Sequence, residues 1–185
     1  LVCKSPFPSM PIYFWNDKNN KKYESAYFKK FKNIWSHGDY AEKKSNGGYV
    51  IYGRSDTTLN PGGVRLGTSE IYSEVEKFKE IKESIVVGQS WDNDVRIILF
   101  IIMSKNFSLS NILLNKIKKQ IRKNASPRHV PSKIIVVEDI PRTKSGKLVE
   151  LAVKSTIEGN KIKNIEALEN PEALKQFKNL KELNS

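Results

Sequence analysis

The chain has 185 residues, and its 32 lysines and arginines against 20 aspartates and glutamates give a formal net charge of +12 at pH 7. A hydrophobic fraction of 38% excludes a disordered chain and is typical of a globular protein with one domain, or one domain plus a piece of another. The single cysteine excludes a disulfide framework and the longest apolar run, residues 97–103, is too short to span a membrane, so we expect a cytoplasmic protein without a membrane partner.

The first part of the chain, residues 1–54, is rich in proline and aromatic residues but has few periodic elements. A polar loop over residues 43–48 precedes an apolar run over residues 49–52, which predicts a β-hairpin. The chain starts at Leu1, in ordinary protein sequence, and we expect it to be a fragment of a longer protein. We interpret residues 1–54 as the last β-strands of an incomplete N-terminal domain.

The central stretch, residues 53–72, contains a polar connection between two arginines, Arg54 and Arg65. Gly62 and Gly63 follow a proline there and favour a bend in the backbone. Forked guanidinium groups suit phosphate and ribose oxygens, so the stretch predicts a hinge that handles a phosphate. The alternative is that the arginines form surface salt bridges with nearby acidic residues, namely Asp56, Glu70 or Glu74.

Residues 55–159 predict a regular succession of helices and strands. The expected elements are a helix capped by Thr68 or Ser69, strands at 84–88 and 94–103, a helix opened by Ser110, a strand at 133–138 and a helix at 148–157. This order predicts an α/β (α+β) domain with a short mixed sheet flanked by helices. Residues 160–185 are polar, and we expect them to form a surface extension with a helix after Pro171.

The loop over residues 141–147, PRTKSGK, lies between a predicted strand and a predicted helix. Gly146 lets the backbone bend, and the flexible stem of Lys147 can carry a positive charge to a phosphate. Such a lysine offsets the charge that grows in a phosphoryl-transfer transition state. An exposed lysine loop without a function is the alternative, and an isolated SGK triplet favours it.

A second candidate is Asp39, in the glycine-containing turn of residues 37–39, HGD. Its carboxylate could accept two hydrogen bonds from a sugar diol. A turn-stabilising aspartate is the alternative.

Residues 104–133 contain eight basic residues and no acidic one, which allows a nucleic-acid-binding face. Only one aromatic residue, Phe107, lies among them, whereas single-strand binders stack bases on several aromatic side chains. A solvated helix face, or a site for a small phosphorylated ligand, fits this stretch better.

The order of these motifs resembles the adenylate-forming superfamily, which includes acyl-CoA synthetases, peptide-synthetase adenylation domains and luciferases. The shared motifs are HGD, GRSD with the proline–glycine bend and Arg65, and PRTKSGK. The stretches PSMPIYFWND, WSHGDY, SPRHVPS and NPEAL are similar to the acetoacetate-activating branch of that family. Because such enzymes pair a large N-terminal domain with a small mobile C-terminal domain, the resemblance implies that residues 55–159 are the mobile domain.

The resemblance also implies roles for single residues in the nucleotide chemistry. Asp39 and Arg54 match the residues that bind the ribose of AMP, and Arg65 matches an arginine near the ATP phosphates. Lys147 matches the lysine that catalyses adenylation, and Asp56 matches the hinge residue on which the small domain turns.

For CoA, the resemblance places Gly62 and Gly63 along the pantetheine tunnel. Arg122 aligns by its spacing from the SGK loop with an arginine that contacts the CoA nucleotide.

The activity implied by the resemblance is that of an AMP-forming ligase. It would convert acetoacetate, ATP and CoA, with Mg²⁺, into acetoacetyl-CoA, AMP and pyrophosphate through an acyl-adenylate. The phosphate loop, the adenine pocket and the acyl pocket of the family do not occur in these residues, so we expect the chain alone to be inactive and to act with its own N-terminal domain. The alternatives are a ligase for acetate or propionate and, from another class, a basic nucleic-acid-binding module.

Overall fold

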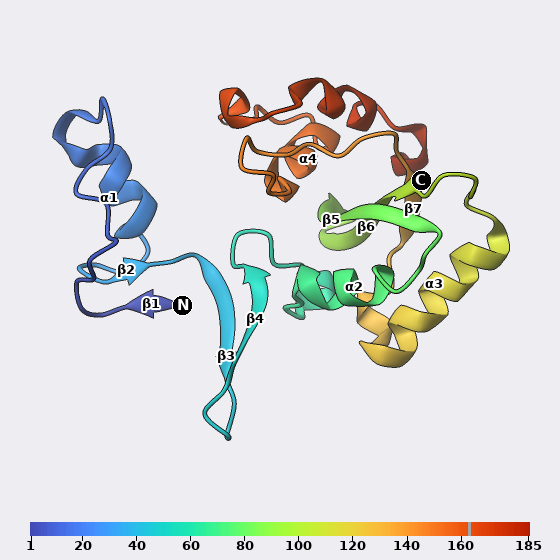
Figure 1. Ribbon diagram of the computed structural model, residues 1–185, viewed down its shortest axis with the longest axis horizontal. Helices are drawn as coiled ribbons and strands as arrows, with labels where there is room; N and C mark the ends of the chain where they lie inside the picture. The colour runs from blue at the N-terminus through green and yellow to red at the C-terminus, as the bar shows by residue number, and fades with distance from the viewer. Residues whose placement is uncertain (163) are drawn as a thin grey trace. The chain divides into compact units, whose positions relative to one another are not determined.

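The structure is a computed structural model that describes residues 1–162 and 164–185. It divides into two compact units, unit 1 from Leu1 to Asp56 and unit 2 from Thr57 to Ser185. Helices and small sheets occur in both units (Figure 1), and the mixed α/β fold expected from the sequence is confirmed.

Unit 1 contains two small antiparallel sheets and one short helix. The elements are β1 (Val2–Cys3) paired with β2 (Trp35–Ser36), the 3-10 turn η1 (Lys18–Asn20), α1 (Lys21–Tyr27), and β3 (Asp39–Lys43) paired with β4 (Tyr49–Arg54). The carboxylate of Asp17 accepts the N–H groups of Lys22 and Tyr23 at 2.9 and 2.8 Å, which satisfies two of the unpaired donors at the start of α1.

The interior of unit 1 is an aromatic cluster around Trp35, whose side chain is buried. The ring of Tyr27 stacks on Trp35 with 3.7 Å between centroids, and Phe7 and Phe28 meet the same ring edge-on. Trp35 is the only hydrophobic residue of unit 1, all of whose residues are described, that is buried. Aromatic contacts, rather than a layered core, therefore hold this unit together.

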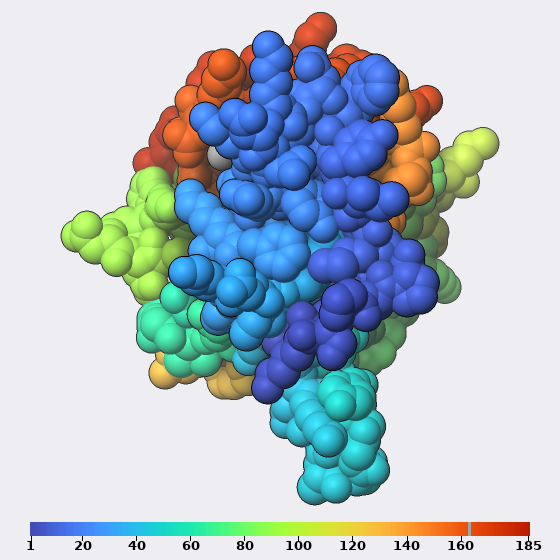
Figure 2. Space-filling view, turned by 90° about the vertical axis from the view of Figure 1, so that its left-hand side faces the viewer, coloured from blue at the N-terminus to red at the C-terminus, as the bar shows by residue number. Residues whose placement is uncertain are grey.

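The hairpin of β3 and β4 confirms the predicted hairpin. Its turn is closed by hydrogen bonds between Lys44 and Gly48, and between Gly47 and Lys44. Its apolar residues Tyr49, Val50 and Ile51 stay exposed. In the space-filling view the cyan hairpin projects from the rest of unit 1 (Figure 2).

Unit 2 is built on a three-stranded sheet in the order β5–β6–β7. β5 (Ile81–Trp91) is antiparallel to β6 (Asp94–Met103), and β7 (Lys133–Val136) is parallel to β6. Asp92 and Asn93, which join β5 to β6, have φ angles of 48° and 58°, as a tight two-residue hairpin turn requires. The expected mixed sheet is therefore present, with β5 longer than the predicted strand.

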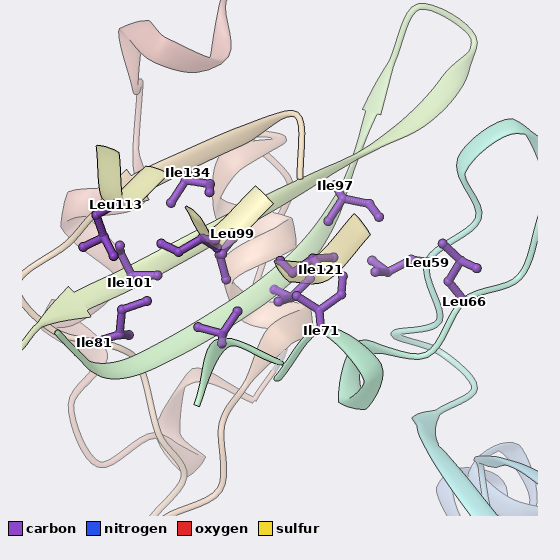
Figure 3. Close-up of a cluster of buried hydrophobic side chains, with 13 residues drawn as sticks. Leu59, Leu66, Ile71, Ile81, Ile97, Leu99, Ile101, Leu113, Ile121 and Ile134 are labelled. Carbon is purple, nitrogen blue, oxygen red and sulfur yellow. The ribbon is translucent and has the colours of Figure 1, made fainter. Parts of the chain in front are cut away.

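Both faces of this sheet are buried, and the alternation of side chains along β6 separates two cores. Ile97, Leu99 and Ile101 enter the core on one face (Figure 3), whereas Ile98 and Phe100 enter the core on the other. In Figure 1, α2 (Thr68–Val75) and α3 (Asn111–Asn124) lie on the first side, and α4 (Glu150–Ile157) lies on the second.

The caps of the two helices differ in how well the sequence predicts them. Ser110 caps α3 as expected, since its hydroxyl accepts the N–H of Leu113 at 3.2 Å. The expectation that Thr68 or Ser69 caps α2 is wrong, because Gly67 holds the cap position and the Glu70 carboxylate accepts its N–H at 3.1 Å. Thr68 is instead the first helical residue and is buried.

The remaining elements of unit 2 are short 3-10 turns. They are η2 (Pro61–Gly63), η3 (Pro127–His129), η4 (Ile165–Ala167), η5 (Pro171–Phe177) and η6 (Lys181–Leu183).

The last three of these turns belong to the C-terminal segment, which we define as residues 164–185. The expectation of a surface extension is wrong for this segment, because Leu168, Leu174, Phe177 and Leu183 are buried in the second core. Phe177 meets Phe100 of β6 edge-on with 4.9 Å between ring centroids. The segment therefore forms part of the cover of the sheet.

Candidate functional site

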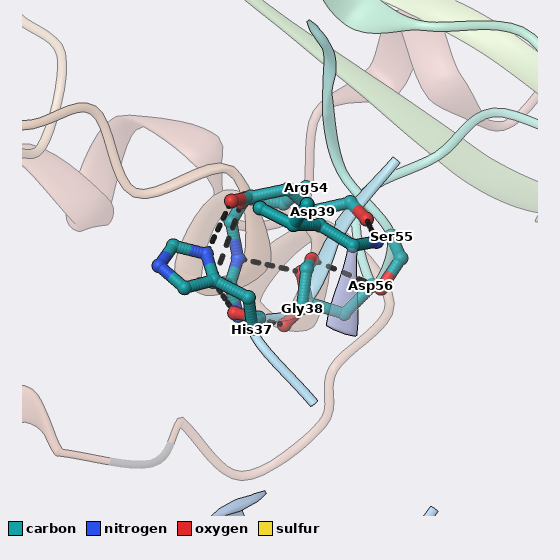
Figure 4. A network of polar contacts seen from close by, with 7 residues as sticks. His37, Gly38, Asp39, Arg54, Ser55 and Asp56 are labelled. Atoms are coloured by element: carbon teal, nitrogen blue, oxygen red, sulfur yellow. Dashed lines mark hydrogen bonds and ion pairs between the residues drawn. The ribbon is translucent and has the colours of Figure 1, made fainter. Parts of the chain in front are cut away.

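The first group of predicted site residues lies where β3 begins and β4 ends. Asp39 and Arg54 are directly opposite each other in the hairpin register, and Figure 4 shows their side chains turned toward each other. One Arg54 Nη1 lies 3.7 Å from Asp39 Oδ1 and donates to the carbonyl of His37 at 3.1 Å. His37 in turn contacts the second carboxylate oxygen of Asp39 through Nδ1. The antiparallel pairing thus assembles the two residues predicted to bind ribose.

Asp56 is drawn into the same network. Arg54 donates from Nε and Nη2 to the two carboxylate oxygens of Asp56, at 3.2 and 3.3 Å. This forked contact is the salt bridge that the sequence left open as an alternative for Arg54. Side chains that are about half exposed gain little from such a pair, roughly 0–1 kcal/mol, so the contact orients the guanidinium more than it stabilises the unit.

Gly38 is required at the centre of this turn. Its φ is +88°, and a Cβ placed there would lie 2.7 Å from Nη2 of Arg54. Its carbonyl accepts both the N–H and the hydroxyl of Ser55, at 2.7 and 2.9 Å. The middle residue of the HGD motif therefore lets the arginine approach the turn.

The second group is the bend of η2 in unit 2. Leu59 and Leu66 pair across it, and Gly62 and Gly63 have positive φ angles of 57° and 75°. The N–H of Gly62 donates to both carboxylate oxygens of Asp94 at 2.9 Å. These bonds hold the backbone of the bend open to solvent, with Gly63 facing empty space.

Basic residues surround this bend without forming one cluster. A guanidinium nitrogen of Arg128 would lie 3.1 Å from a Cβ built on Gly62. Arg122 is exposed near the end of α3, whose opposite face buries Leu113, Ile117 and Ile121. The geometry of α3 matches the solvated helix face that the sequence favours over a nucleic-acid face.

The third group is the loop that carries Lys147. Arg142 and Leu148 pair across it, Thr143 N–H donates to Lys147 O at 2.9 Å, and Lys147 N–H donates to Thr143 Oγ1 at 3.0 Å. Gly146, at φ +79°, closes the turn. The ammonium of Lys147 is exposed and makes no hydrogen bond or ion pair to another residue in the described part of the chain. The loop is thus a tight hairpin that presents a positive charge.

Two side chains that sequence reasoning did not single out hold this hairpin to the domain. Arg142 donates to the carbonyl of Gly146 at 3.1 Å and forms an ion pair with Glu83 on β5. Nothing in the spacing of Glu83 identifies it as the partner, because the two residues are 59 positions apart.

Beside the loop, Glu150 at the start of α4 is tied to α2. The hydroxyl of Tyr72 donates to Glu150 at 2.6 Å and accepts the N–H of Val86 at 3.0 Å. Burial raises the pKa of Tyr72 well above its ordinary value, with the Glu150 carboxylate acting in the same direction. Tyr72 therefore stays protonated and remains a donor.

A separate polar cluster joins α2 to α3. Glu74 accepts hydrogen bonds from Lys77 at 2.6 Å, Gln120 at 3.0 Å and Asn124 at 2.8 Å. The bond from Lys77, aided by those from the two amides, lowers the pKa of Glu74. The carboxylate is held ionised as a structural contact between the helices.

Among the described residues, no three His, Cys, Asp or Glu side chains come together in a way that could hold a metal ion. Within the same residues, no helix combines the length and the apolar character needed to cross a membrane.

The chain was then compared with known proteins. The family model named AMP-binding enzyme C-terminal domain matches residues 70–147. The acetoacetyl-coenzyme A synthetase of Rhizobium meliloti (strain 1021) is 57% identical over 185 residues, which are 100% of this chain and 28% of that protein. The acetoacetyl-CoA synthetase of Xenopus tropicalis is 50% identical over 99% of this chain and 28% of that protein.

Among solved structures, the acetoacetyl-CoA synthetase from Streptomyces lividans matches with a TM-score of 0.89 and 39% identity. The match covers 100% of this chain and 28% of that one. These comparisons confirm the predicted resemblance and the fold, and they do not favour a nucleic-acid-binding module. This chain spans little more than a quarter of the length of the relatives it matches.

Proposed function

Because the chain carries an AMP-binding enzyme C-terminal domain and matches acetoacetyl-CoA synthetases along its whole length, we propose that it is part of an AMP-forming acetoacetate–CoA ligase. The proposed reaction converts acetoacetate, ATP and CoA into acetoacetyl-CoA, AMP and pyrophosphate. The whole-chain identity of 57% to a protein of that name is the observation that carries the proposal.

In the first half-reaction, a carboxylate oxygen of acetoacetate attacks the α-phosphorus of ATP, and pyrophosphate leaves. The proposed role of Lys147 is to offset the negative charge that grows on the phosphate oxygens. Its ammonium suits this role because it is exposed at the tip of a rigid hairpin and has no carboxylate partner among the described residues. Arg65 would act near the phosphates as a second cation.

The ribose of the nucleotide would bind at the hairpin of unit 1. Asp39 supplies acceptors for two hydroxyl groups, and Arg54, already directed at Asp39, supplies donors. Their placement on paired strands supports this role, because it keeps the two side chains at a fixed separation.

In the second half-reaction, the thiol of CoA attacks the carbonyl carbon of the acyl-adenylate, loses its proton, and displaces AMP. We propose that the open bend of Gly62 and Gly63 accommodates the pantetheine arm and that Arg122 contacts the nucleotide of CoA. Asp56 would serve as the hinge between residues 1–54, which we propose belong to an N-terminal domain, and the mobile domain at 55–159.

Mg²⁺ does not fit a site on this chain, since the described residues offer no cluster of metal ligands. No step of the proposal is assigned to a metal held by these residues. The proposal includes the rest of the protein's N-terminal domain as the partner that completes the ATP and acyl sites, and a cytoplasmic location, as the sequence predicts.

The test separates the two half-reactions in the full-length protein. Lys147→Ala should lower acetoacetate-dependent ATP–pyrophosphate exchange by about 100- to 1000-fold, because one charge-stabilising group is lost. Thioester formation from supplied acetoacetyl-adenylate and CoA should be retained.

The matched control is Lys144→Ala, which removes an exposed lysine three residues earlier in the same loop and should leave both half-reactions unchanged. An equal loss in both half-reactions for Lys147→Ala would refute the proposed division of labour.

A further inference from the structure

The loop that carries Lys147 begins beyond the sheet, and the C-terminal segment supplies its missing support. β7 ends at Val136, so no strand of the sheet pairs with residues 138–144. Instead Glu169 N–H donates to Arg142 O at 2.8 Å, and Lys144 N–H donates to Ala167 O at 3.2 Å. Thr143 and Leu168 thereby pair as an isolated antiparallel bridge.

Asn170 completes this support with its side-chain amide. Its Oδ1 accepts the N–H of Arg142 at 2.8 Å, while its Nδ2 donates to Asp139 Oδ2 at 2.6 Å and to Ile140 O at 3.0 Å. One amide thus satisfies a donor and two acceptors that lie about thirty residues earlier in the chain. An aspartate or a leucine of similar size could not make the same set of bonds.

Gln176 repeats the arrangement one step upstream. Its Oε1 accepts the N–H of Glu138 at 2.7 Å, and its Nε2 donates to the carbonyl of Asp139 at 2.8 Å. Two side-chain amides from the C-terminal segment therefore take the place of a neighbouring strand for the backbone that enters the loop.

The segment is a firm support because its own apolar residues are in the core. Leu168 and Leu174 flank Asn170 in sequence, and both are buried, as is Phe177 next to Gln176. A residue anchored on both sides in this way has little freedom to shift, and so it fixes what it contacts.

The support extends to Lys147 through Thr143. Thr143 pairs with Leu168 of the C-terminal segment, and it also holds Lys147 by two backbone-directed hydrogen bonds of 2.9 and 3.0 Å. A shift of residues 142–144 would therefore move the lysine with them.

We propose that the C-terminal segment positions Lys147 for the first half-reaction and that Asn170 is the positioning residue that connects them. This inference rests on the proposed function of Lys147. Asn170 acts through the loop and does not touch the substrate; its effect is on the placement of the ammonium. A displacement of about 1 Å at a reacting group can reduce a rate by about 100-fold.

The activity test uses Asn170→Ala in the full-length protein. ATP–pyrophosphate exchange should fall by about 10- to 100-fold, with little change in KM for ATP, because binding groups remain and only the charge is misplaced. Thioester formation from supplied acetoacetyl-adenylate should not change. Glu172→Ala, which removes an exposed side chain from the same segment, is the control and should match the unaltered protein. Unchanged exchange activity, or equal losses in both half-reactions, would overturn the proposal.

A second measurement does not depend on activity. Amide hydrogen exchange should speed up at Arg142 and Lys147 in Asn170→Ala, whereas the amides paired between β5 and β6 should keep their protection. Unchanged protection at Arg142 would overturn the proposed support even if activity falls. If Lys147→Ala keeps full activity, the proposed function fails, and this exchange result still reports on the support.

A reciprocal exchange of the two side chains provides the third test. Asn170→Asp places two carboxylates against each other at Asp139 and should be slower than Asn170→Ala in the first half-reaction. Combining it with Asp139→Asn restores one donor and one acceptor to that contact, so part of the activity should return. No recovery in the double variant would contradict the assigned contact.

Discussion

The two units of this molecule hold their site residues in different ways. In unit 2, two cores on opposite faces of one sheet support the Lys147 hairpin, and the buried aliphatic residues of the chain all belong to these cores. In unit 1, Trp35 is the only buried hydrophobic residue, and Asp39, Arg54 and Asp56 interact on a half-exposed hairpin.

The difference shows that a fixed position can come from packing or from backbone geometry. Lys147 is placed by a loop anchored to a core, so its position depends on remote apolar contacts. Asp39 and Arg54 are placed by strand pairing and a glycine turn, so their position depends on local backbone conformation. Three sets of variants examine this contrast.

The largest expected effect is on unit 2. Phe177→Ala removes a fully buried ring that packs against Phe100, and should lower the stability of unit 2 by about 3–5 kcal/mol. Hydrogen exchange at the β6 amides measures this loss, and the β4 amides of unit 1 report whether it stays local.

The control is Phe107→Ala, at a ring that is 44% exposed, which should change stability by less than about 0.5 kcal/mol. A loss for Phe177→Ala no larger than for Phe107→Ala would show that the C-terminal segment does not share in the core.

A smaller effect is expected in unit 1 from Gly38→Ala. The positive φ strains the alanine and its Cβ collides with Arg54, so we expect a loss of about 1–3 kcal/mol in the protection of the Ser55 amide. The measurement is site-resolved hydrogen exchange on this hairpin.

Gly47→Ala is the matched control, because its φ of +85° carries similar strain but nothing lies within 4 Å of the added Cβ. The difference between the two variants isolates the collision with Arg54. Equal effects at both glycines would mean that the arginine moves aside freely.

The smallest effects compare a buried carboxylate with an exposed one. Glu74→Gln in unit 2 should cost about 1 kcal/mol at pH 7, because it removes a charged acceptor from three donors. Asp56→Asn in unit 1 should cost less than that, since its pair with Arg54 is exposed.

The two variants should also differ in their response to pH. The pKa of Glu74 is lowered in the folded chain, so its contribution is present above the unfolded value of about 4.3 and is lost as pH falls through the folded pKa. In urea unfolding at a series of pH values, the gap between the unaltered chain and Glu74→Gln should therefore close below about pH 4.3. A gap that persists at pH 3 would contradict this account.

The sheet of unit 2 could be predicted because its signal is local. The β-branched run of β6 and the helical spacing of Leu113, Ile117 and Ile121 are visible in short windows of sequence, and both elements formed as predicted. The HGD and PRTKSGK motifs were visible for the same reason, since each lies within a few consecutive residues.

The C-terminal segment could not be predicted in this way. Its buried residues Leu168, Leu174, Phe177 and Leu183 lie on 3-10 turns, which do not produce the spacing of an α-helix or a strand. Among many polar neighbours, such residues look like a solvated tail until a hydrophobic surface is available to receive them.

By itself the sequence determined the order of the elements, the family resemblance and the residue types available for phosphate chemistry. Only the tertiary structure decided which partner each polar side chain takes. Arg54 pairs with Asp56 as well as Asp39, Glu83 holds Arg142, and Asn170 supports the loop of Lys147. Such pairings depend on distances between elements far apart in the chain, and those distances are set by which apolar faces are buried against each other.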